Sequence, residues 1–227
     1  MVHKQIVRRT GIIHALDVTT FDKAKHIAVR VAPYVDAIKI TLPLILREGA
    51  DVISNIGLEV EVPIIADLKV ADIELTSTTI VKSIITHGAN GVTFIGMVGA
   101  DVMQSCIEEA HKHHVSTFIV TELSNPGAVR FMHRNGKDIA RMAKKLGSDG
   151  IVAPATRPDR VKEYRKIIGK DVMIMSPGIG IQGGRVGDAI KAGADFEVIG
   201  RSIYDADDPE EAARRFAEIL THRKTHG

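Results

Sequence analysis

The chain has 227 residues, of which 44% are hydrophobic and 26% are charged, and its formal net charge is +2. This length allows one large α/β domain or two small ones, and the composition is ordinary for a globular protein. The net charge is too small to indicate a nucleic-acid or membrane partner, and no apolar run approaches the roughly 20 residues of a membrane-spanning helix. The polar beginning of the chain, MVHKQIVRRT, is not typical of a signal peptide.

Short apolar segments alternate along the chain with longer amphipathic stretches, and we expect these to form strands and helices. Gly88, Gly147, Gly169 and Gly193 follow four of the helical stretches, where a left-handed cap is expected. The expected helices include FDKAKHIAVRVAPY, TSTTIVKSIITHG, DVMQSCIEEAHKHH, RPDRVKEYRKIIG and DDPEEAARRFAEIL. The eight expected strands are GIIHALD, DAIKI, VPIIADLK, GVTFIG, STFIVTEL, GIVAPA, VMIMSP and FEVIG.

The alternation of eight strands with eight helices predicts a (β/α)8 barrel, also called a TIM barrel. Repeated β-α units favour parallel strands joined by right-handed crossovers. The chain is slightly shorter than the usual ~250 residues of this fold. A doubly wound open sheet is the alternative, but the regularity of eight units favours closure. We expect a single domain over residues 1–227, with its core at about residues 11–220.

Charged residues stand where several of the expected strands end, which is the side of this barrel that carries active sites. Asp17 ends the first strand, Lys39 the second, and Asp67 and Lys69 the third. Residues two apart on a strand share a face, so Asp67 and Lys69 are predicted to point inward together. Asp72 lies in the loop that follows. A surface ion-pair cluster is the alternative, but five charges at one end of a barrel favour a catalytic site.

Two segments near the end of the chain predict a phosphate site. SPGIGIQGG follows the seventh strand and VIGRSIY ends the eighth, and in many barrels these two loops bind phosphate. Glycines let backbone N–H groups approach an anion, and Arg201 and Gln182 supply further donors. The glycines also spell G-x-G-x-x-G, but Arg201 stands where a dinucleotide site needs an acid. A merely tight loop is the remaining alternative.

Together these segments resemble the orotidine 5′-phosphate decarboxylase family in its short, single-domain form. ADLKVAD matches the D-x-K-x-x-D signature of that family, which on its own defines only a superfamily. The segments ALDV, IKITLPLIL, TELSNPGA, SPGIGIQGG and IGRSIY are similar to the other active-site segments, in the same order. The combination of TELSNPGA with Pro177, Gln182 and Arg201 is more specific, and the resemblance extends from about Gly11 to the last helix.

The resemblance implies decarboxylation of orotidine 5′-monophosphate to uridine 5′-monophosphate in de novo pyrimidine biosynthesis, without a cofactor or metal. Lys69 would donate a proton to C6 of the pyrimidine, and Asp67 would lie beside the substrate carboxylate. Asp17 and Lys39 would belong to the ribose contacts and the charge network. The implied contacts with the rest of the substrate are Ser124 at the pyrimidine edge and Pro177, Gln182, Gly200 and Arg201 at the phosphate.

The resemblance also implies a homodimer in which Asp72 and Thr76 reach the active site of the neighbouring subunit. The reaction would be expected in the cytoplasm. Cys106, the only cysteine, excludes an internal disulfide and fits a reducing compartment. We expect its thiol to be packed in a helix rather than to react.

Two other functions stay open. One is a magnesium-dependent decarboxylase or aldolase of the same superfamily that acts on keto-sugar phosphates. Those relatives carry an acid at the end of the second strand, where this chain has Lys39, and a cation there would repel Mg²⁺. The other is a non-catalytic barrel that binds phosphosugars, which would need the phosphate loops but not the Asp67–Lys69–Asp72 cluster.

Overall fold

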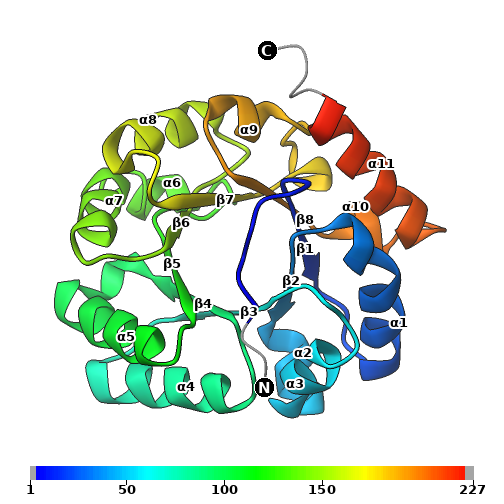
Figure 1. The fold of residues 1–227 in the computed structure, drawn as a ribbon. Coiled ribbons are helices and arrows are strands. Elements are labelled where there is room, and N and C mark those ends of the chain that lie inside the picture. Colours follow the sequence, from blue (N-terminus) through cyan, green and yellow to red (C-terminus); the bar gives the residue numbers. More distant parts are fainter. Residues whose placement is uncertain (1–3, 223–227) are drawn as a thin grey trace.

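The apolar segments within residues 4–222, which the computed structural model describes, form eight parallel strands that close into a barrel (Figure 1). Each strand pairs with the next along the chain, and the first pairs with the last, so the predicted TIM barrel is confirmed and the open sheet is wrong. The strands are β1 (Ile12–Leu16), β2 (Ala37–Thr41), β3 (Ile64–Val70), β4 (Gly91–Ile95), β5 (Ser116–Val120), β6 (Gly150–Val152), β7 (Met173–Pro177) and β8 (Phe196–Ile199).

Helices surround the barrel and return the chain from the end of one strand to the start of the next (Figure 1). Two α-helices follow each of β2, β5 and β8, where the alternation predicted one. The α-helices are α1 (Phe21–Val31), α2 (Leu42–Glu48), α3 (Asp51–Gly57), α4 (Glu74–Thr86), α5 (Ala100–Lys112), α6 (Ala128–Phe131), α7 (Gly136–Lys145), α8 (Pro158–Ile168), α9 (Asp188–Ala192), α10 (Arg201–Tyr204) and α11 (Pro209–His222). Short 3-10 helices are η1 (Ala32–Tyr34), η2 (Gly96–Val98) and η3 (Gly180–Gln182).

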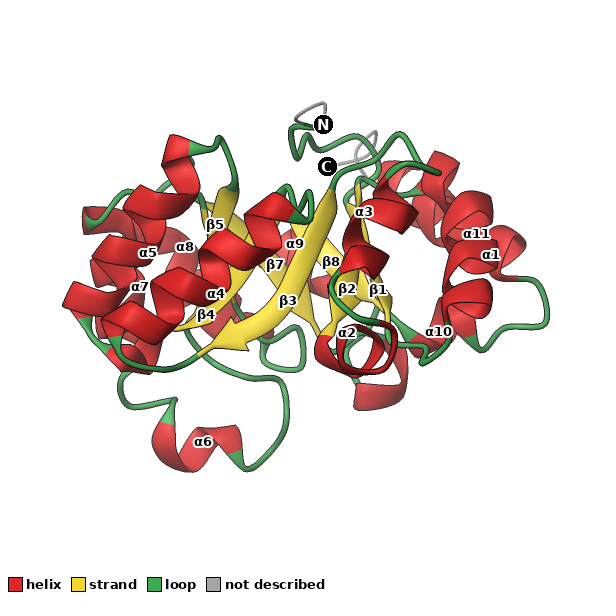
Figure 2. Ribbon diagram, turned by 90° about the horizontal axis from the view of Figure 1, so that it is seen from below, coloured by secondary structure: helices red, strands yellow, loops and turns green. Residues whose placement is uncertain are grey.

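Glycines end several of these helices, as the sequence predicts. Gly88, Gly147, Gly169 and Gly193 all have positive φ angles, between 76° and 111°. Gly49, with φ 82°, also separates α2 from α3 and is the local reason that one expected helix became two. Figure 2 shows α6 standing apart from the barrel at the end toward which β3 points. None of the helices in residues 4–222 is long and apolar enough to cross a membrane.

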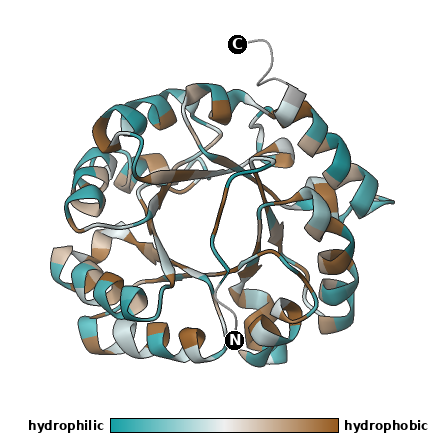
Figure 3. Ribbon diagram, viewed as in Figure 1, coloured by the Kyte–Doolittle hydropathy of each residue, from teal (hydrophilic) through white to brown (hydrophobic). Residues whose placement is uncertain are grey.

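Successive side chains of a strand point to opposite faces, which produces one apolar layer inside the barrel and another between the strands and the helices. On β2, Ile38 and Ile40 pack in the large cluster between the strands and the helices, whereas Ala37 packs inside the barrel. Figure 3 shows the hydrophobic strands and the more hydrophilic outer helices. Ile6 packs against the inner cluster and lies close to Gly91, the first residue of β4. The N-terminal segment therefore covers the end of the barrel where the strands begin.

Cys106 lies buried in the outer layer, which confirms the predicted packed thiol, and this burial raises the thiol pKa to about 11. The limits of the domain stay a prediction, because residues 1–3 and 223–227 lie outside the described part of the chain.

Candidate active site

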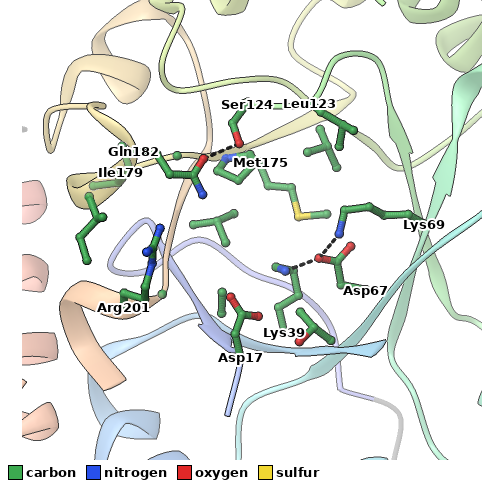
Figure 4. Close-up of a pocket in the computed structure, with 18 of the residues that line it drawn as sticks. Asp17, Lys39, Asp67, Lys69, Leu123, Ser124, Met175, Ile179, Gln182 and Arg201 are labelled. Atoms are coloured by element: carbon green, nitrogen blue, oxygen red, sulfur yellow. Dashed lines mark hydrogen bonds and ion pairs between the residues drawn. The ribbon is translucent and has the colours of Figure 1, made fainter. Parts of the chain in front are cut away.

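A cavity of about 470 Å³ opens where the strands end. Figure 4 shows Lys39, Asp67 and Lys69 on one side of it and Gln182 and Arg201 on the other. The structure therefore brings together, from strands at opposite ends of the sequence, most of the residues that the sequence singled out. The predicted residues that line the cavity are Asp17, Lys39, Asp67, Lys69, Ser124, Pro177, Gln182, Gly200 and Arg201.

The Asp67 carboxylate lies at the centre of the charged side. Lys39 and Lys69 both donate hydrogen bonds to its Oδ2 atom, and the Lys69 Nζ–Oδ2 distance is 2.8 Å. Burial alone would raise the pKa of this carboxyl, but the charges and hydrogen bonds of the two lysines outweigh burial and hold the pKa well below its usual range. Asp67 is therefore ionised at neutral pH and fixes the positions of both ammonium groups.

The strand that carries this pair is distorted. Ala66 pairs with Val92 and Val70 with Phe94, so three residues of β3 lie opposite a single residue of β4. Within this shift Lys69 has φ 49°, a left-handed backbone conformation that residues other than glycine rarely adopt. Asp67 and Lys69 both point into the cavity, as the two-residue spacing predicts, but through a backbone that the spacing does not predict.

Thr93 is the residue of β4 opposite this distortion, and the sequence analysis missed it. Its Oγ1 atom accepts a hydrogen bond from the Lys69 backbone N–H at 2.9 Å and donates one to Asp67 Oδ1 at 2.8 Å. Thr93 is fully buried. The available signal was a hydroxyl side chain in the middle of the otherwise apolar strand GVTFIG.

Ser124 connects two walls of the cavity. Its Oγ donates a hydrogen bond to Gln182 Oε1 at 2.6 Å, which joins the loop after β5 to the loop after β7. Behind this loop, Arg157 donates to the carbonyl of Leu123 and to Glu122, whose carboxylate is completely buried. Glu122 stands in the recognised segment TELSNPGA, but its partner Arg157 lies 35 residues later, beyond the reach of local patterns.

The loop after β7 is held in shape by its own backbone. Gly178, Gly180 and Gly183 have φ angles of 111°, 76° and 98°. The N–H of Gly184 donates to the carbonyl of Gly178 at 2.9 Å, and a Cβ at Gly184 would lie only 2.6 Å from that carbonyl oxygen. Across the loop, Arg201 is exposed at the start of α10. The N–H groups of Gly180, Gly183 and Gly184 are used within the loop. An anion at this end of the cavity would therefore meet the side chains of Gln182 and Arg201.

Asp72 and Thr76 lie outside the cavity lining. Both are exposed, and Asp72 Oδ1 accepts a hydrogen bond from the N–H of Ile73, just before α4 begins. Their predicted role is in a neighbouring subunit, and it stays a prediction. Among residues 4–222, no group of three or more His, Cys, Asp or Glu is arranged to hold a metal ion.

Known proteins resemble this chain over most of its length. The model of the "Orotidine 5′-phosphate decarboxylase / HUMPS family" matches residues 10–216. The orotidine 5′-phosphate decarboxylase of Methanosarcina mazei is 48% identical over 213 residues, which are 94% of this chain and 96% of the relative. That of Methanococcoides burtonii is 45% identical over 214 residues, 94% of this chain and 98% of the relative.

Solved structures agree with this similarity. The orotidine 5′-monophosphate decarboxylase of Methanocaldococcus jannaschii, complexed with the inhibitor BMP, superposes with a TM-score of 0.88 at 38% identity, covering 92% of this chain and 98% of its own. The orotidine 5′-phosphate decarboxylase of Pyrococcus horikoshii gives a TM-score of 0.85 at 38% identity, covering 92% and 99%. The resemblance predicted from ADLKVAD, TELSNPGA and the phosphate-loop residues is thereby confirmed, and the chain belongs to the orotidine 5′-phosphate decarboxylase / HUMPS family.

Proposed function

We propose that this chain decarboxylates orotidine 5′-monophosphate to uridine 5′-monophosphate in de novo pyrimidine biosynthesis, without a cofactor. The observation that carries the proposal is the ionised Asp67 carboxylate held between Lys39 and Lys69, across a cavity from Arg201 and the glycine loop. The names of the relatives and the family assignment support the same reaction.

The cavity has a suitable group for each part of this substrate. Arg201 would bind the phosphate, together with Gln182 from the loop after β7. Ser124, which donates to Gln182 in the structure, would read the pyrimidine edge and so link the two ends of the ligand. Asp17, on the β1 side, would contact the ribose. Pro177 and Gly200 also line the cavity and would shape its walls around the phosphate.

The chemistry needs a cation fixed close to one carbon atom. When the bond between C6 and the carboxylate breaks, CO₂ leaves and the electron pair stays in an sp² orbital of C6, where no adjacent carbonyl can delocalise it. The Lys69 ammonium is attracted more strongly as this charge develops, and it then transfers a proton to C6. Lys69 regains a proton from water, so the sum is substrate plus H⁺ giving product plus CO₂.

Asp67 can contribute in two ways. Two unit charges 4 Å apart repel by about 4 kcal/mol at an effective dielectric constant near 20, so relief of repulsion from the substrate carboxylate is worth up to about three powers of ten in rate. The other contribution is orientation of Lys39 and Lys69. The contacts of the Asp67 carboxylate with both lysines support orientation as its main role.

The magnesium-dependent alternative would need a carboxylate ligand at the end of β2, where this chain has the cation Lys39. The family name covers a second group besides the decarboxylases, so the name alone does not choose between them. Lys39 points into the cavity and donates to Asp67, which places positive charge beside the carboxylate that a metal would use. We therefore expect activity to survive exhaustive treatment with EDTA.

We also propose that two copies of the chain form a homodimer with shared active sites, and that the enzyme works in the cytoplasm. Large apolar side chains are exposed after the adjacent strands β2, β3 and β4: Leu46 is 76% exposed, Ile73 69%, Leu75 75% and Met97 50%. Exposed apolar side chains such as Ile73 and Leu75, close to Asp72 in the sequence, are typical of an interaction surface. A second copy of the chain is the occupant that would also give Asp72 and Thr76 a site to enter.

The decisive experiment follows the absorbance of orotidine 5′-monophosphate after enzyme is added. Wild-type protein should consume it, and Lys69→Ala should abolish turnover while still binding uridine 5′-monophosphate in calorimetry. Lys82→Ala, exposed on α4 and outside the cavity, is the control and should keep wild-type kcat. Near-normal kcat in Lys69→Ala would contradict the proton-donor role.

Two other results would point to the other functions. Activity lost on chelation and restored by Mg²⁺ would favour the keto-sugar reaction. Tight binding of the phosphate-bearing ligand with no turnover in the wild type would favour a non-catalytic barrel.

A further inference from the structure

Thr93 stands where the barrel wall is irregular beside the charged cluster. The pairing of β3 with β4 shifts between Ala66 and Val70, so Asp67, Leu68 and Lys69 together face Thr93. The alternation of β4 turns Val92 and Phe94 toward the helices and Thr93 toward the barrel interior. Its hydroxyl is therefore the polar group of β4 that meets the distorted segment.

The hydroxyl satisfies one group on each side of the distortion. It accepts from the Lys69 backbone N–H and donates to Asp67 Oδ1, which uses its single proton and a lone pair. Asp67 then has Oδ1 held by Thr93 and Oδ2 held by the two lysines, so rotation of the carboxylate would break hydrogen bonds at both oxygens.

The Lys69 backbone needs such support. A non-glycine residue in the left-handed region is strained by about 1–2 kcal/mol, and such conformations persist only where surrounding contacts impose them. The bond from the Lys69 N–H to Thr93 is a contact of this kind. If it were lost, the peptide could relax and carry the Lys69 ammonium away from its place above Asp67.

We propose that Thr93 is a positioning residue of the decarboxylation site, whose hydroxyl fixes the strained Lys69 backbone and the Asp67 carboxylate in one arrangement. This inference rests on the proposed function, since it assigns Thr93 an effect on the step in which Lys69 acts. Thr93 is absent from the cavity lining, so its effect reaches the substrate through Asp67 and Lys69.

The test compares Thr93→Val, Thr93→Ser and Thr117→Val. Valine keeps the shape of threonine and removes the hydroxyl, whereas serine keeps the hydroxyl. Thr117 is the matched control: it is also a fully buried threonine of the barrel whose Oγ1 donates to a carboxylate, Asp149 Oδ2 at 3.0 Å, but it lies near the start of β5, away from the cavity. Melting temperatures, kcat, KM and uridine 5′-monophosphate affinity are measured for each.

Thr93→Val should lower kcat by about tenfold to a hundredfold, because displacement of a catalytic group by about 1 Å has an effect of that size. KM and product affinity should change by less than about threefold, and Thr93→Ser should recover most of kcat. Thr117→Val should lose comparable thermal stability and keep its kcat. If Thr93→Val does not fold, Thr93→Ala replaces it in the same comparison.

Several results would overturn the inference. In one, Thr93→Val and Thr117→Val lose stability alike and both keep kcat, so that the hydroxyl is merely structural. In another, Thr93→Ser is as slow as Thr93→Val. Failure of the proposed function looks different, because the wild-type protein itself would then leave orotidine 5′-monophosphate unchanged.

Discussion

Arg201 lines the cavity and forms no ion pair with a carboxylate in the described part of the chain. If it holds the phosphate, Arg201→Ala should raise KM by about 30-fold or more, because a lost charge-assisted, two-pronged contact is worth about 2 kcal/mol. The control is Arg215→Ala, exposed on α11 and outside the cavity lining, which should keep the wild-type KM. Steady-state kinetics decides, and equal KM values in the two variants would remove Arg201 from the phosphate site.

Residues of the site differ in how far the sequence predicts them. Asp67, Lys69 and Arg201 could be found because each stands at the end of a strand, and strand ends meet in this fold. Thr93 could not be assigned a role, because its partners depend on the register of β3 against β4. The shift in register places three residues of β3 opposite one residue of β4, and the Lys69–Thr93 contact joins positions 24 residues apart, beyond the reach of local patterns.

His14 is a buried residue of β1 whose imidazole is held neutral. Its Nδ1–H donates to the carbonyl of Ile199 at 3.0 Å, and its ring lies edge-on to Tyr204. Burial lowers the pKa of the imidazole to about 4, although the bond to Ile199 and the charge of Asp17 act in the opposite direction. The buried Nε2 atom has no hydrogen-bond partner, so a proton there would add an uncompensated charge.

This pKa predicts a loss of stability in mild acid. The unfolded chain, with an ordinary histidine pKa near 6.5, binds a proton before the folded protein does, so this contribution is complete above pH 6.5 and is lost as the pH falls toward 4. The loss should reach about 3 kcal/mol in urea unfolding. His14→Gln should show a correspondingly smaller difference between pH 7 and pH 4.5. Parallel losses in both proteins would contradict the assignment.

At the scale of elements, the loop after β7, which includes η3, has features that the sequence predicts and one that it does not. Three closely spaced glycines indicate a backbone that other residues rarely adopt, and Gly178, Gly180 and Gly183 do have positive φ angles. The close approach of Gly184 to the carbonyl of Gly178 is not visible in that spacing, since it depends on how the loop folds back. Similarly, the division into α2 and α3 depends on one glycine within an otherwise continuous pattern.

Gly184→Ala should open this loop, because the added Cβ would lie 2.6 Å from a backbone oxygen that no rotamer change can move. We expect a KM at least about tenfold higher, since a displaced loop would carry Gln182 away from the phosphate. Gly49→Ala is the control: its φ of 82° makes alanine strained, but nothing lies within 4 Å of the new atom. It should lose about 1 kcal/mol of stability and keep its KM. A normal KM in Gly184→Ala would show that the loop does not shape the phosphate site.

At the scale of the whole molecule, the site depends on the closed barrel and, in our proposal, on a second copy of it. Closure could be predicted from the number of repeats, because eight β-α units are the number that this barrel requires. The partner could be inferred only by resemblance. The exposed Ile73 and Leu75 beside Asp72 fit an interface, but one chain does not contain the surface that would cover them.

Mixed dimers test that partner. Lys69→Ala and Asp72→Ala homodimers should each be strongly impaired. After subunit exchange, one site of a mixed dimer takes Lys69 from one chain and Asp72 from the other and is intact, while the second site lacks both. Random exchange makes half of the dimers mixed, so about a quarter of wild-type activity should return. If Asp72 serves the site of its own chain, every mixed site lacks one residue and no activity returns.

The pairing of β1 with β8 closes the barrel, and it also determines when the barrel can close during translation. The ribosome makes β1 among the first residues of the chain and β8 among the last. β1 leaves the ribosome early and has no partner on its β8 side until nearly the whole chain has been made. During that time β1 exposes apolar residues and an unpaired strand edge, and such surfaces promote aggregation. We therefore expect the nascent chain to be bound by chaperones. Asp17 and Arg201 come to line the same cavity only when this pairing forms, and each new molecule therefore becomes able to hold its substrate at the very end of its own translation.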